Sequence, residues 1–522
     1  MITNKSSIIF FSILILFIPA ASAFSGSYDM LNQDNASWYG ATYSRLARTL
    51  DWADVNGDGE ADAIVGAYLN NSNAYGAVYI LYGPQDNVTD VNIATKANVS
   101  LSGEGITYYL GSCIGSGDIN GDGYDDLVLG SMYAGSIQEG RIYIIYGRSA
   151  NIPSGNIGTV KNATINGTAG TSESLGIMCD TADVNGDGYD DVLAAARAFS
   201  NRGKTYLIYG KSTPFPADDL ITNAYNESWI SGVNSDFAWV VRRAGDINGD
   251  GYDDVLIGAP YYYSYGNGSV YLIYGQGAAF NQQNYTLPSG TNATFTGQTS
   301  TDAAGWSVSS AGDVDNDGYD DFLIAAPGYN SLTGRAYLFY GGAGTPWSGG
   351  YQVTSADATF TSINASDEAG KGDDLGGWPR GGALSYGDFD FNGYSDFLVG
   401  VPYADEGGRT DNGQVVLYYG KAARFSGNYL LNLTDADATF IGEASDYRMS
   451  TLPTGMAENV VRQSILMGGF NINTGDSKGY EMFGDEPPPP PPPSLVPEFS
   501  IITLLLTVLI AGGLIFAIRR HH

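Results

Sequence analysis

The residues most suited to chemistry lie in a nine-residue acidic segment that occurs six times in this 522-residue chain. The copies are spaced 63 to 75 residues apart and begin at Asp54, Asp118, Asp183, Asp246, Asp313 and Asp388. In each copy, positions 1, 3, 5 and 9 supply side-chain oxygens, and position 7 would supply its backbone carbonyl. Calcium takes about six to eight hard oxygen ligands in a flexible cage. The pattern therefore predicts six calcium-binding loops.

Glycine stands at position 6 of every copy, where it permits the sharp turn that points successive oxygens inward. One copy alone would suit an ordinary Asx-rich turn, but six copies in register favour metal binding. The predicted ligands, loop by loop, are Asp54, Asn56, Asp58, Glu60, Asp62; Asp118, Asn120, Asp122, Tyr124, Asp126; Asp183, Asn185, Asp187, Tyr189, Asp191; Asp246, Asn248, Asp250, Tyr252, Asp254; Asp313, Asp315, Asp317, Tyr319, Asp321; Asp388, Asp390, Asn392, Tyr394, Asp396.

The composition agrees with metal cations as partners. The chain has 56 acidic and 24 basic residues, and its net charge of −32 argues against non-specific binding to nucleic acid or an anionic membrane surface. Six bound Ca²⁺ ions would reduce that charge to −20. The only histidines are His521 and His522 at the C-terminus, which excludes histidine-based nucleophilic triads and imidazole metal sites from the body. We therefore expect no enzyme.

The same repeat also predicts the β-strands that position the loops. Each loop leads into a short apolar run, such as 63–66 or 255–258, and a second run follows, such as 77–82. An extended stretch such as 98–103 and a segment entering the next loop complete the unit. Four strands in a period of about 65 residues are typical of one blade of a β-propeller.

A seventh unit follows the sixth loop in eroded form. Residues 464–468 match the strand after the loop, residues 479–484 match the next strand, and the acidic loop itself is lost. This unit also lacks a final outer strand. A spare strand near residues 27–31 could supply it, which would close the ring and remove two exposed edges.

These repeats resemble the FG-GAP repeats of the integrin α-subunit head, over about residues 27–484. The resemblance implies an all-β, seven-bladed propeller that is closed by an N-terminal strand, with structural calcium on one face and ligand binding on the other. Six loops are more than integrins carry, no domain is inserted between units two and three, and the thigh and calf regions are missing. The resemblance therefore does not imply that this chain pairs with a β-subunit.

Both ends of the chain carry targeting patterns outside the expected propeller, residues 24–484. Residues 1–23 form a signal peptide, with an apolar run and the small residues Ala21-Ser22-Ala23 before the cleavage point. Residues 485–498 form a proline-rich stalk. Residues 499–518 are apolar and long enough for a transmembrane helix, and the basic tip 519–522 places the C-terminus in the cytoplasm. We expect a cell-surface protein anchored at its C-terminus.

The residues Val496-Pro497-Glu498-Phe499, the apolar segment and the basic tip resemble the PEF-CTERM sorting signal of archaeal surface proteins. That resemblance implies an archaeal surface protein that is processed by an archaeosortase, with removal of the helix and transfer to lipid. A permanent membrane anchor is the alternative. Twelve Asn-x-Ser/Thr sequons in the body, Asn98 and Asn432 among them, fit a glycoprotein.

Cys113 and Cys179 are the only cysteines. They lie five and four residues before their loops, and this offset points them to opposite faces of equivalent strands. We therefore expect two buried thiols, with a disulfide as the alternative.

The face opposite the loops is the expected binding surface. Its candidate ligand-binding residues are Tyr261, Tyr262, Tyr263 and Tyr265, although tyrosines here could equally pack on neighbouring blades. Acidic insertions at 367–374 and 405–411 suggest either a solvated rim or a further cation site. Three functions remain open: adhesion or recognition through glycan or protein ligands, a structural role in the cell envelope, and carboxylate-based action on surface polysaccharides.

Overall fold

The computed structural model describes residues 24–30, 36–70, 74–83, 88–197, 202–230, 240–260, 266–277, 284–371, 383–446, 448–449, 464–471, 473–474 and 476–483. The chain divides into two units, Met1–Asp485 and Glu486–His522, and every described residue belongs to the first. The predicted signal peptide, stalk, membrane helix and basic tip lie outside the described residues. Within the described ranges, no helix combines the length and apolar character needed to cross a membrane.

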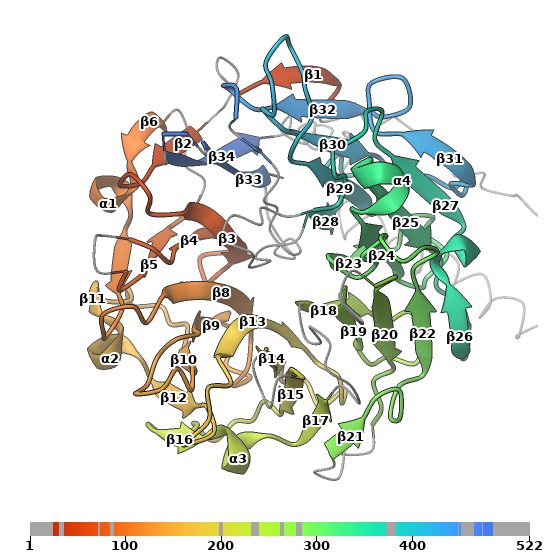
Figure 1. Ribbon diagram of the computed structural model, residues 1–522. Coiled ribbons are helices and arrows are strands. Elements are labelled where there is room, and N and C mark those ends of the chain that lie inside the picture. The colour runs from red at the N-terminus through yellow and green to blue at the C-terminus, as the bar shows by residue number, and fades with distance from the viewer. Residues whose placement is uncertain are drawn as a thin grey trace, which may run out of the picture. The chain divides into compact units, whose positions relative to one another are not determined.

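Seven β-sheets stand around a ring, which confirms the predicted all-β, seven-bladed propeller (Figure 1). In blades one to six, four strands pair antiparallel from the inside of the ring outwards. Their bounds are β3 (Leu46–Ala53), β4 (Asp62–Ala67), β5 (Ala77–Leu81), β7 (Val99–Ser102); β8 (Leu110–Gly117), β9 (Asp126–Ser131), β10 (Arg141–Ile145), β12 (Ala163–Asn166); β13 (Leu175–Ala182), β14 (Asp191–Ala196), β15 (Lys204–Ile208), β17 (Glu227–Ile230); β18 (Val240–Gly245), β19 (Asp254–Ala259), β20 (Ser269–Ile273), β22 (Ala293–Thr296); β23 (Val308–Gly312), β24 (Asp321–Ala326), β25 (Arg335–Phe339), β27 (Ala358–Thr361); β28 (Leu384–Gly387), β29 (Asp396–Val401), β30 (Gln414–Tyr418), β32 (Ala438–Ile441).

Each of these six blades also carries a fifth, parallel strand at its outer edge, which the sequence pattern did not predict. For blades one to five this strand comes from the repeat that follows, so consecutive blades are interlocked. The fifth strands of blades one to six are, in order, β11 (Gly155–Asn156), β16 (Asp219–Leu220), β21 (Asn284–Thr286), β26 (Gly349–Gln352), β31 (Gly427–Leu430) and β1 (Gly26–Asp29).

The two ends of the propeller sequence meet in blade seven. Its strands β33 (Ser464–Phe470) and β34 (Ser477–Phe483) come from the C-terminal side. Strand β2 (Ala36–Tyr39) pairs antiparallel with β34, and β6 (Val88–Asn92) pairs in parallel with β2. The ring is thus closed by N-terminal sequence, as expected.

The predicted closing strand at residues 27–31 was wrong in its position. Strand β1 pairs in parallel with β32 of blade six, whereas β2 supplies the missing outer strand of blade seven. The reason lies in residues 35–40, whose pattern Asn-x-Ser-x-x-Gly matches that of 98–103, and which bury Ala36 and Trp38. Residues 26–29 instead act like the fifth strands of the other blades.

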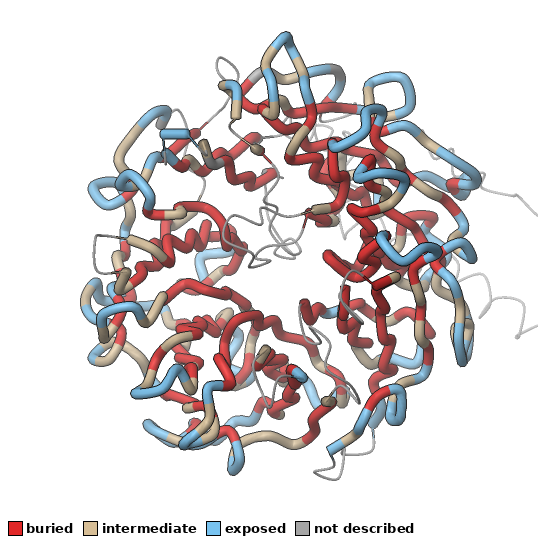
Figure 2. The backbone as a smooth tube through the Cα atoms, viewed as in Figure 1, coloured by how far each residue is buried: buried red, intermediate tan, exposed pale blue. Residues whose placement is uncertain are grey.

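The core lies within and between the blades (Figure 2). The second strand of each loop-bearing blade is buried along its whole length, because it is covered by a neighbouring blade on either face. Exposure is concentrated at the loops and outer strands. The helices of the described part are single turns. Four lie near the outer edge: α1 (Ile93–Lys96), α2 (Ile157–Val160), α3 (Ile221–Ala224) and the 3₁₀ turn η2 (Val353–Ser355), whereas α4 (Tyr329–Leu332) lies in the connection between β24 and β25.

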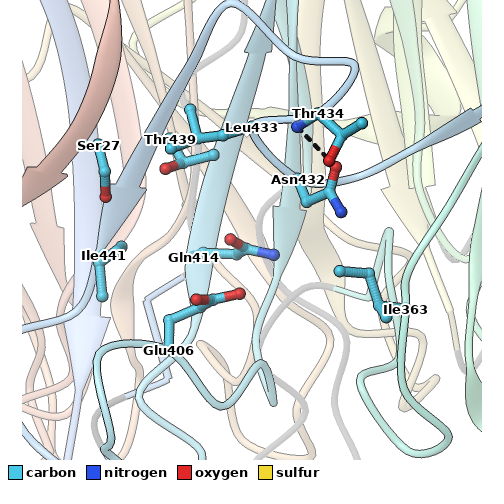
Figure 3. Close-up of a pocket in the computed structure, with 9 residues that line it drawn as sticks. All are labelled: Ser27, Ile363, Glu406, Gln414, Asn432, Leu433, Thr434, Thr439 and Ile441. Carbon is cyan, nitrogen blue, oxygen red and sulfur yellow. Dashed lines mark hydrogen bonds between the residues drawn. The ribbon is translucent and has the colours of Figure 1, made fainter.

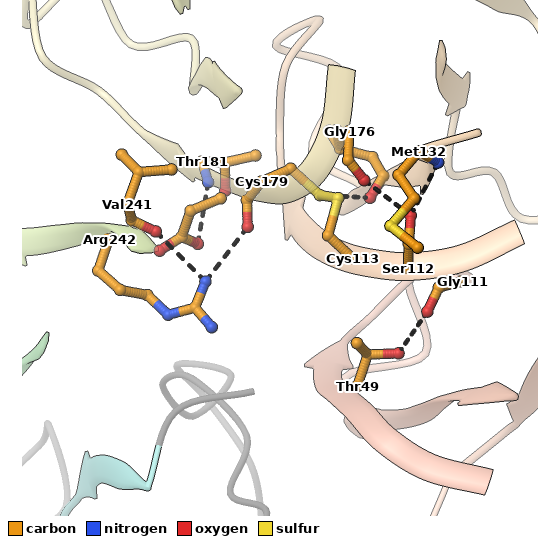
Figure 4. The surroundings of a disulfide bond; sticks show 12 residues. Thr49, Gly111, Ser112, Cys113, Met132, Gly176, Cys179, Thr181, Val241 and Arg242 are labelled. Carbon is orange, nitrogen blue, oxygen red and sulfur yellow. Dashed lines mark hydrogen bonds between the residues drawn. A yellow bond between two sulfur atoms is a disulfide. The ribbon is translucent and has the colours of Figure 1, made fainter. Parts of the chain in front are cut away.

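Cys113 and Cys179 form a disulfide between blades two and three, with their Cα atoms 5.6 Å apart (Figure 4). The expectation of two separate thiols was therefore wrong. Its premise, that the cysteines point to opposite faces of equivalent strands, ignored how blades stack. Because facing blades share one interface, a side chain from one face of β8 meets a side chain from the opposite face of β13. Both cysteines are buried there, at 2% and 0% exposure.

Candidate metal sites

All six acidic loops have the same length. Each connects the first and second strands of a blade through eight residues, from position 1 to position 8, and position 9 begins the second strand. The hairpin geometry places all six loops on one face of the ring. The first aspartate organises its own loop: Asp183 Oδ1 accepts the backbone N–H of Gly186 at 2.7 Å, and its Oδ2 accepts that of Gly188 at 3.0 Å. These hydrogen bonds to the Asp183 carboxylate stabilise the turn of the loop.

The aspartate at position 9 is buried below the loop. In loop three, Asp191 is fully buried, and its carboxylate accepts the backbone N–H groups of Val184 at 3.2 Å and Gly210 at 2.9 Å. Burial, together with the charges of Asp187 and Asp183, raises the pKa of Asp191 to about 8. A buried carboxylate beside two further acidic groups is costly without a compensating cation. Calcium would supply that charge.

The other loops repeat this arrangement. Burial comes first among the causes that raise the pKa of every position-9 aspartate. The pKa reaches about 8 for Asp62, Asp126 and Asp254, about 9 for Asp321, and lies well above its usual range for Asp396.

Two loops already bring three carboxylates together. Ligand oxygens lie within 4.8 Å of one another in the triads Asp313, Asp315, Asp317 and Asp388, Asp390, Asp396. These triads stand out because position 3 is aspartate in loops five and six but asparagine in loops one to four. The donor set of both triads fits a hard divalent cation.

Some contacts would have to change when a metal binds. In loop two, the Nδ2 group of Asn120 donates to the carboxylate of Asp126 at 3.1 Å, so the amide must turn to offer its oxygen. In loop five, Arg424 forms ion pairs with Asp315 and Asp317 and supplies part of the positive charge. The remaining Oδ1 atom of Asp315 is buried and has no hydrogen-bond partner.

Two positions of the loop do more than the sequence indicated. The tyrosine at position 7 was predicted only as a carbonyl ligand, yet its ring packs against the preceding loop. The aspartate at position 8, which we had not considered, bonds to position 1 of the preceding loop. The recurring Gly-Tyr-Asp-Asp sequence was the signal that could have revealed both contacts.

The proposed ligand face is only partly described. Tyr261, Tyr262, Tyr263 and Tyr265 lie outside the described residues. Elsewhere on this face, the ring centroids of Tyr109 and Tyr133 lie 5.1 Å apart and both side chains are half-buried. Among the connections here that are described throughout, the length varies from seven residues at 103–109 to twelve at 402–413.

The acidic insertions of blade six hydrogen-bond within their own loops. Asp367 accepts hydrogen bonds from the Ser362 hydroxyl and from the N–H of Asn364, and Asp405 accepts one from the N–H of Asp411 at 2.8 Å. Residues 372–374 lie outside the described part. Among the residues that the structure places, these insertions form no cluster of three metal-ligating groups, so the further cation site gains no support.

A shallow pocket of about 410 Å³ opens at the outer edge of blade six (Figure 3). Its polar lining includes Glu406 and Gln414, while Ile363 and Leu433 contribute exposed apolar side chains. Gln414 is held in place because its Nε2 group donates to the carbonyl of Leu431 at 3.1 Å.

Comparisons with known proteins agree with this geometry. The model of the FG-GAP repeat matches residues 111–145, 243–273, 304–347 and 380–418, and that of the FG-GAP-like repeat matches 183–257. Phosphatidylinositol-glycan-specific phospholipase D of Homo sapiens is 27% identical over 405 residues, covering 73% of this chain and 46% of that protein. Integrin alpha-V of Gallus gallus is 26% identical, covering 43% of this chain and 20% of the integrin.

A solved structure described as the Dos1 propeller covers 88% of this chain and 94% of its own, with 13% identity and a TM-score of 0.38. The repeats and the seven blades define the class: the chain is an FG-GAP repeat β-propeller. More particularly, it is related to the integrin α-subunits and to phosphatidylinositol-glycan-specific phospholipase D. The chain spans less than half the length of these relatives.

Proposed function

We propose that this chain is a calcium-stabilised recognition propeller at the cell surface, which binds a glycan or protein on the face opposite the acidic loops. The contrast between its two faces carries the proposal. One face bears six loops of identical length, whereas the fully described connections on the other face range from seven to twelve residues. Uniform loops suit a repeated structural ion, and variable loops on a rigid scaffold suit recognition.

The buried aspartates at position 9 support calcium as the stabilising ion. A ligand that binds only the folded chain stabilises it by about 2.7 kcal/mol per site when its free concentration is 100 times its Kd. We expect about six structural Ca²⁺ ions. Chelation should therefore lower the melting temperature markedly, and replacing Asp254 and Asp321 together by Asn should reproduce part of that loss. An identical melting curve in calcium and in excess EDTA would contradict the calcium role.

Two observations support an extracellular location. The buried disulfide is typical of proteins from oxidising compartments, and residues 1–23 have the pattern of a signal peptide. The C-terminal segment would hold the propeller at the membrane, either as a retained helix or after processing by an archaeosortase and transfer to lipid.

The relatives allow two other functions. One relative is named a phospholipase D, and an enzyme that acts on surface polysaccharides is one alternative. A structural envelope component without a ligand is the main alternative. It differs from the recognition propeller in one measurable property, which is saturable binding.

Binding of the full-length chain to a glycan array and to whole cells tests the recognition role. Tyr133→Ala should weaken binding because it removes aromatic surface from the variable face, and Tyr262→Ala, at a position that the sequence predicts on that face, should do the same. Gln276→Ala is the matched control, since Gln276 is exposed beside the acidic loops, where its N–H bonds to Val184. An absence of saturable binding by the wild type favours the structural role, and turnover of a polysaccharide panel favours an enzyme.

A further inference from the structure

The acidic loops are joined to one another through position 8. In loop three, the carboxylate of Asp190 accepts the backbone N–H of Asp118, the first residue of loop two, at 2.8 Å. The backbone N–H of Asp190 in turn donates to the carbonyl of Asp118 at 3.0 Å. Two hydrogen bonds thus hold the first residue of one loop against the eighth residue of the next. We call this pair of bonds the clasp.

Four such clasps link loops one to five in a continuous series. The carboxylate bonds to position 1 of the preceding loop measure 2.7 to 2.9 Å, and the backbone bonds measure 3.0 to 3.3 Å. The clasp pairs are Asp125 with Asp54, Asp190 with Asp118, Asp253 with Asp183, and Asp320 with Asp246.

A ring contact accompanies each clasp. The tyrosine at position 7 packs over the glycine at position 4 of the preceding loop. A Cβ atom on Gly121 would lie only 2.4 Å from Cε1 of Tyr189, and the same closeness recurs between Gly186 and Tyr252. Glycine is required there because any side chain would displace the ring.

The series stops at both ends of the loop array. Loop one has Ala61 at position 8, and blade seven, which would precede it, has no acidic loop. Between loops five and six only half of the clasp exists: the N–H of Ser395 donates to the carbonyl of Asp313 at 2.9 Å, and serine has no carboxylate for the other bond. The interface between loops five and six therefore lacks a complete clasp and can be compared with the other four.

Three of the clasp carboxylates interact with one cation, the exposed side chain of Arg243. Arg243 lies on the inner strand of blade four, and its Nε group is 3.0 Å from Oδ2 of Asp253. Its charge also interacts with Asp190 and Asp320. Arg243 thus reduces the repulsion among these three carboxylates and offsets part of the rise in pKa that burial causes in Asp190, Asp253 and Asp320.

We infer that the clasps couple the loops, so that calcium binds to neighbouring loops cooperatively. Position 1 is a predicted ligand of its own ion and also organises its own turn, so its backbone must be fixed before the site is complete. An ion bound in the following loop would hold that loop's position 9. Because position 8 adjoins position 9, the ion would also hold the clasp that position 8 makes with position 1 of the preceding loop. The first ion therefore reduces the conformational entropy that the neighbouring loop loses when the second ion binds. The position-8 aspartates are positioning residues rather than ligands.

This inference rests on the proposed calcium role, and one titration separates the two. Calcium uptake by the purified full-length chain is measured by calorimetry after chelation. We expect a Hill coefficient clearly above about 1 for the wild type. Asp190→Ala should lower it while the number of bound ions stays the same. Asp190→Asn keeps an oxygen acceptor for the N–H of Asp118 and should restore it.

The outcomes are distinct. No calcium uptake by the wild type overturns the proposed calcium role itself. Uptake with a Hill coefficient of about 1 overturns the coupling alone, as does the loss of one bound ion in Asp190→Ala, because position 8 would then be a ligand. If Asp190→Ala does not fold, Ser395→Asp provides the test: it adds the missing carboxylate between loops five and six and should raise the Hill coefficient, and an unchanged value contradicts the coupling.

Discussion

Blades one to six and blade seven hold the ring together by different means. The loop-bearing blades meet through hairpins of equal length whose acidic side chains suit metal ions. Blade seven has no acidic loop and is assembled from strands at the two ends of the propeller, β33 and β34 on one side and β2 on the other. The blade without an acidic loop is therefore completed by pairing between distant segments of the chain.

The apolar packing of the two kinds of blade is nevertheless alike. Trp38 in β2 of blade seven and Trp229 in β17 of blade three occupy the same third position of the fourth strand, and both are buried. What differs is the sequence distance to the partner strand. The pairing of β2 with β34 joins residues more than 400 positions apart, whereas β17 pairs with β15 of its own repeat.

The largest expected effect comes from truncating these two tryptophans. Trp38→Ala and Trp229→Ala should each lower the free energy of unfolding by about 3 to 5 kcal/mol, through lost burial and the cavity left behind. Only Trp38→Ala should also loosen the N-terminal strand, which limited proteolysis would detect as early release of residues near 24–40. Equal protection of the N-terminus in both variants would contradict the special role of blade seven.

The disulfide adds a covalent link at one loop-bearing interface only. Replacing both Cys113 and Cys179 by Ala should cost about 4 kcal/mol, the chain-entropy value for closing a loop whose ends are 66 residues apart. Denaturant unfolding with and without reductant measures this. Ile114→Val, at the interface of blades one and two, is the control and should cost about 1 kcal/mol.

Wild-type protein should lose stability in reductant, whereas the double variant should not respond. If both proteins unfold at the same denaturant concentration in the absence of reductant, the link contributes nothing to the ring.

The last expected effect is on the pH dependence of stability, and it comes from the buried position-9 aspartates of blades one to six. In the folded chain without calcium, the pKa of Asp191 is about 8, above the usual aspartate value. The folded state then holds a proton that the unfolded state releases, so stability falls as pH rises from about 4 to about 8. The melting temperature in EDTA should decline over this range, and calcium should reduce the decline. A flat profile in EDTA would argue against buried, unpaired carboxylates in the loops.

Much of this fold follows from local repetition. The spacing of the acidic loops predicted the number of blades, and the apolar runs predicted the second and third strands. Pairing between repeats was harder to see, because nothing local to residues 155–156 or 219–220 indicates a fifth strand in the blade before. The closing strand was misplaced for the same reason, because its partner is distant in the sequence. Only the similarity of residues 35–40 to 98–103 identifies β2, rather than β1, as the fourth strand of blade seven.

Sequence reasoning about the loops was strongest for residues that serve their own loop. Asp183 at position 1 holds the turn of its own loop, and Asp191 at position 9 is buried below that turn. The contacts of Asp190 and of the Tyr189 ring were missed because their partners lie in the preceding blade. The cysteines show the same error, since opposite faces of equivalent strands become a shared interface once blades stack. Calcium binding and the ligand of the opposite face remain predictions.

The exchange of strands between repeats also sets the order in which the protein can be completed during synthesis. Strand β1 has its partner in β32, and β2 has its partner in β34, near the end of the propeller. These two N-terminal strands are therefore synthesised long before their partners β32 and β34. We expect the nascent chain to leave β1 without its partner until Ile441 has been made, and the β34 side of β2 with Trp38 open until Phe483 has been made, which makes this period its most vulnerable to aggregation.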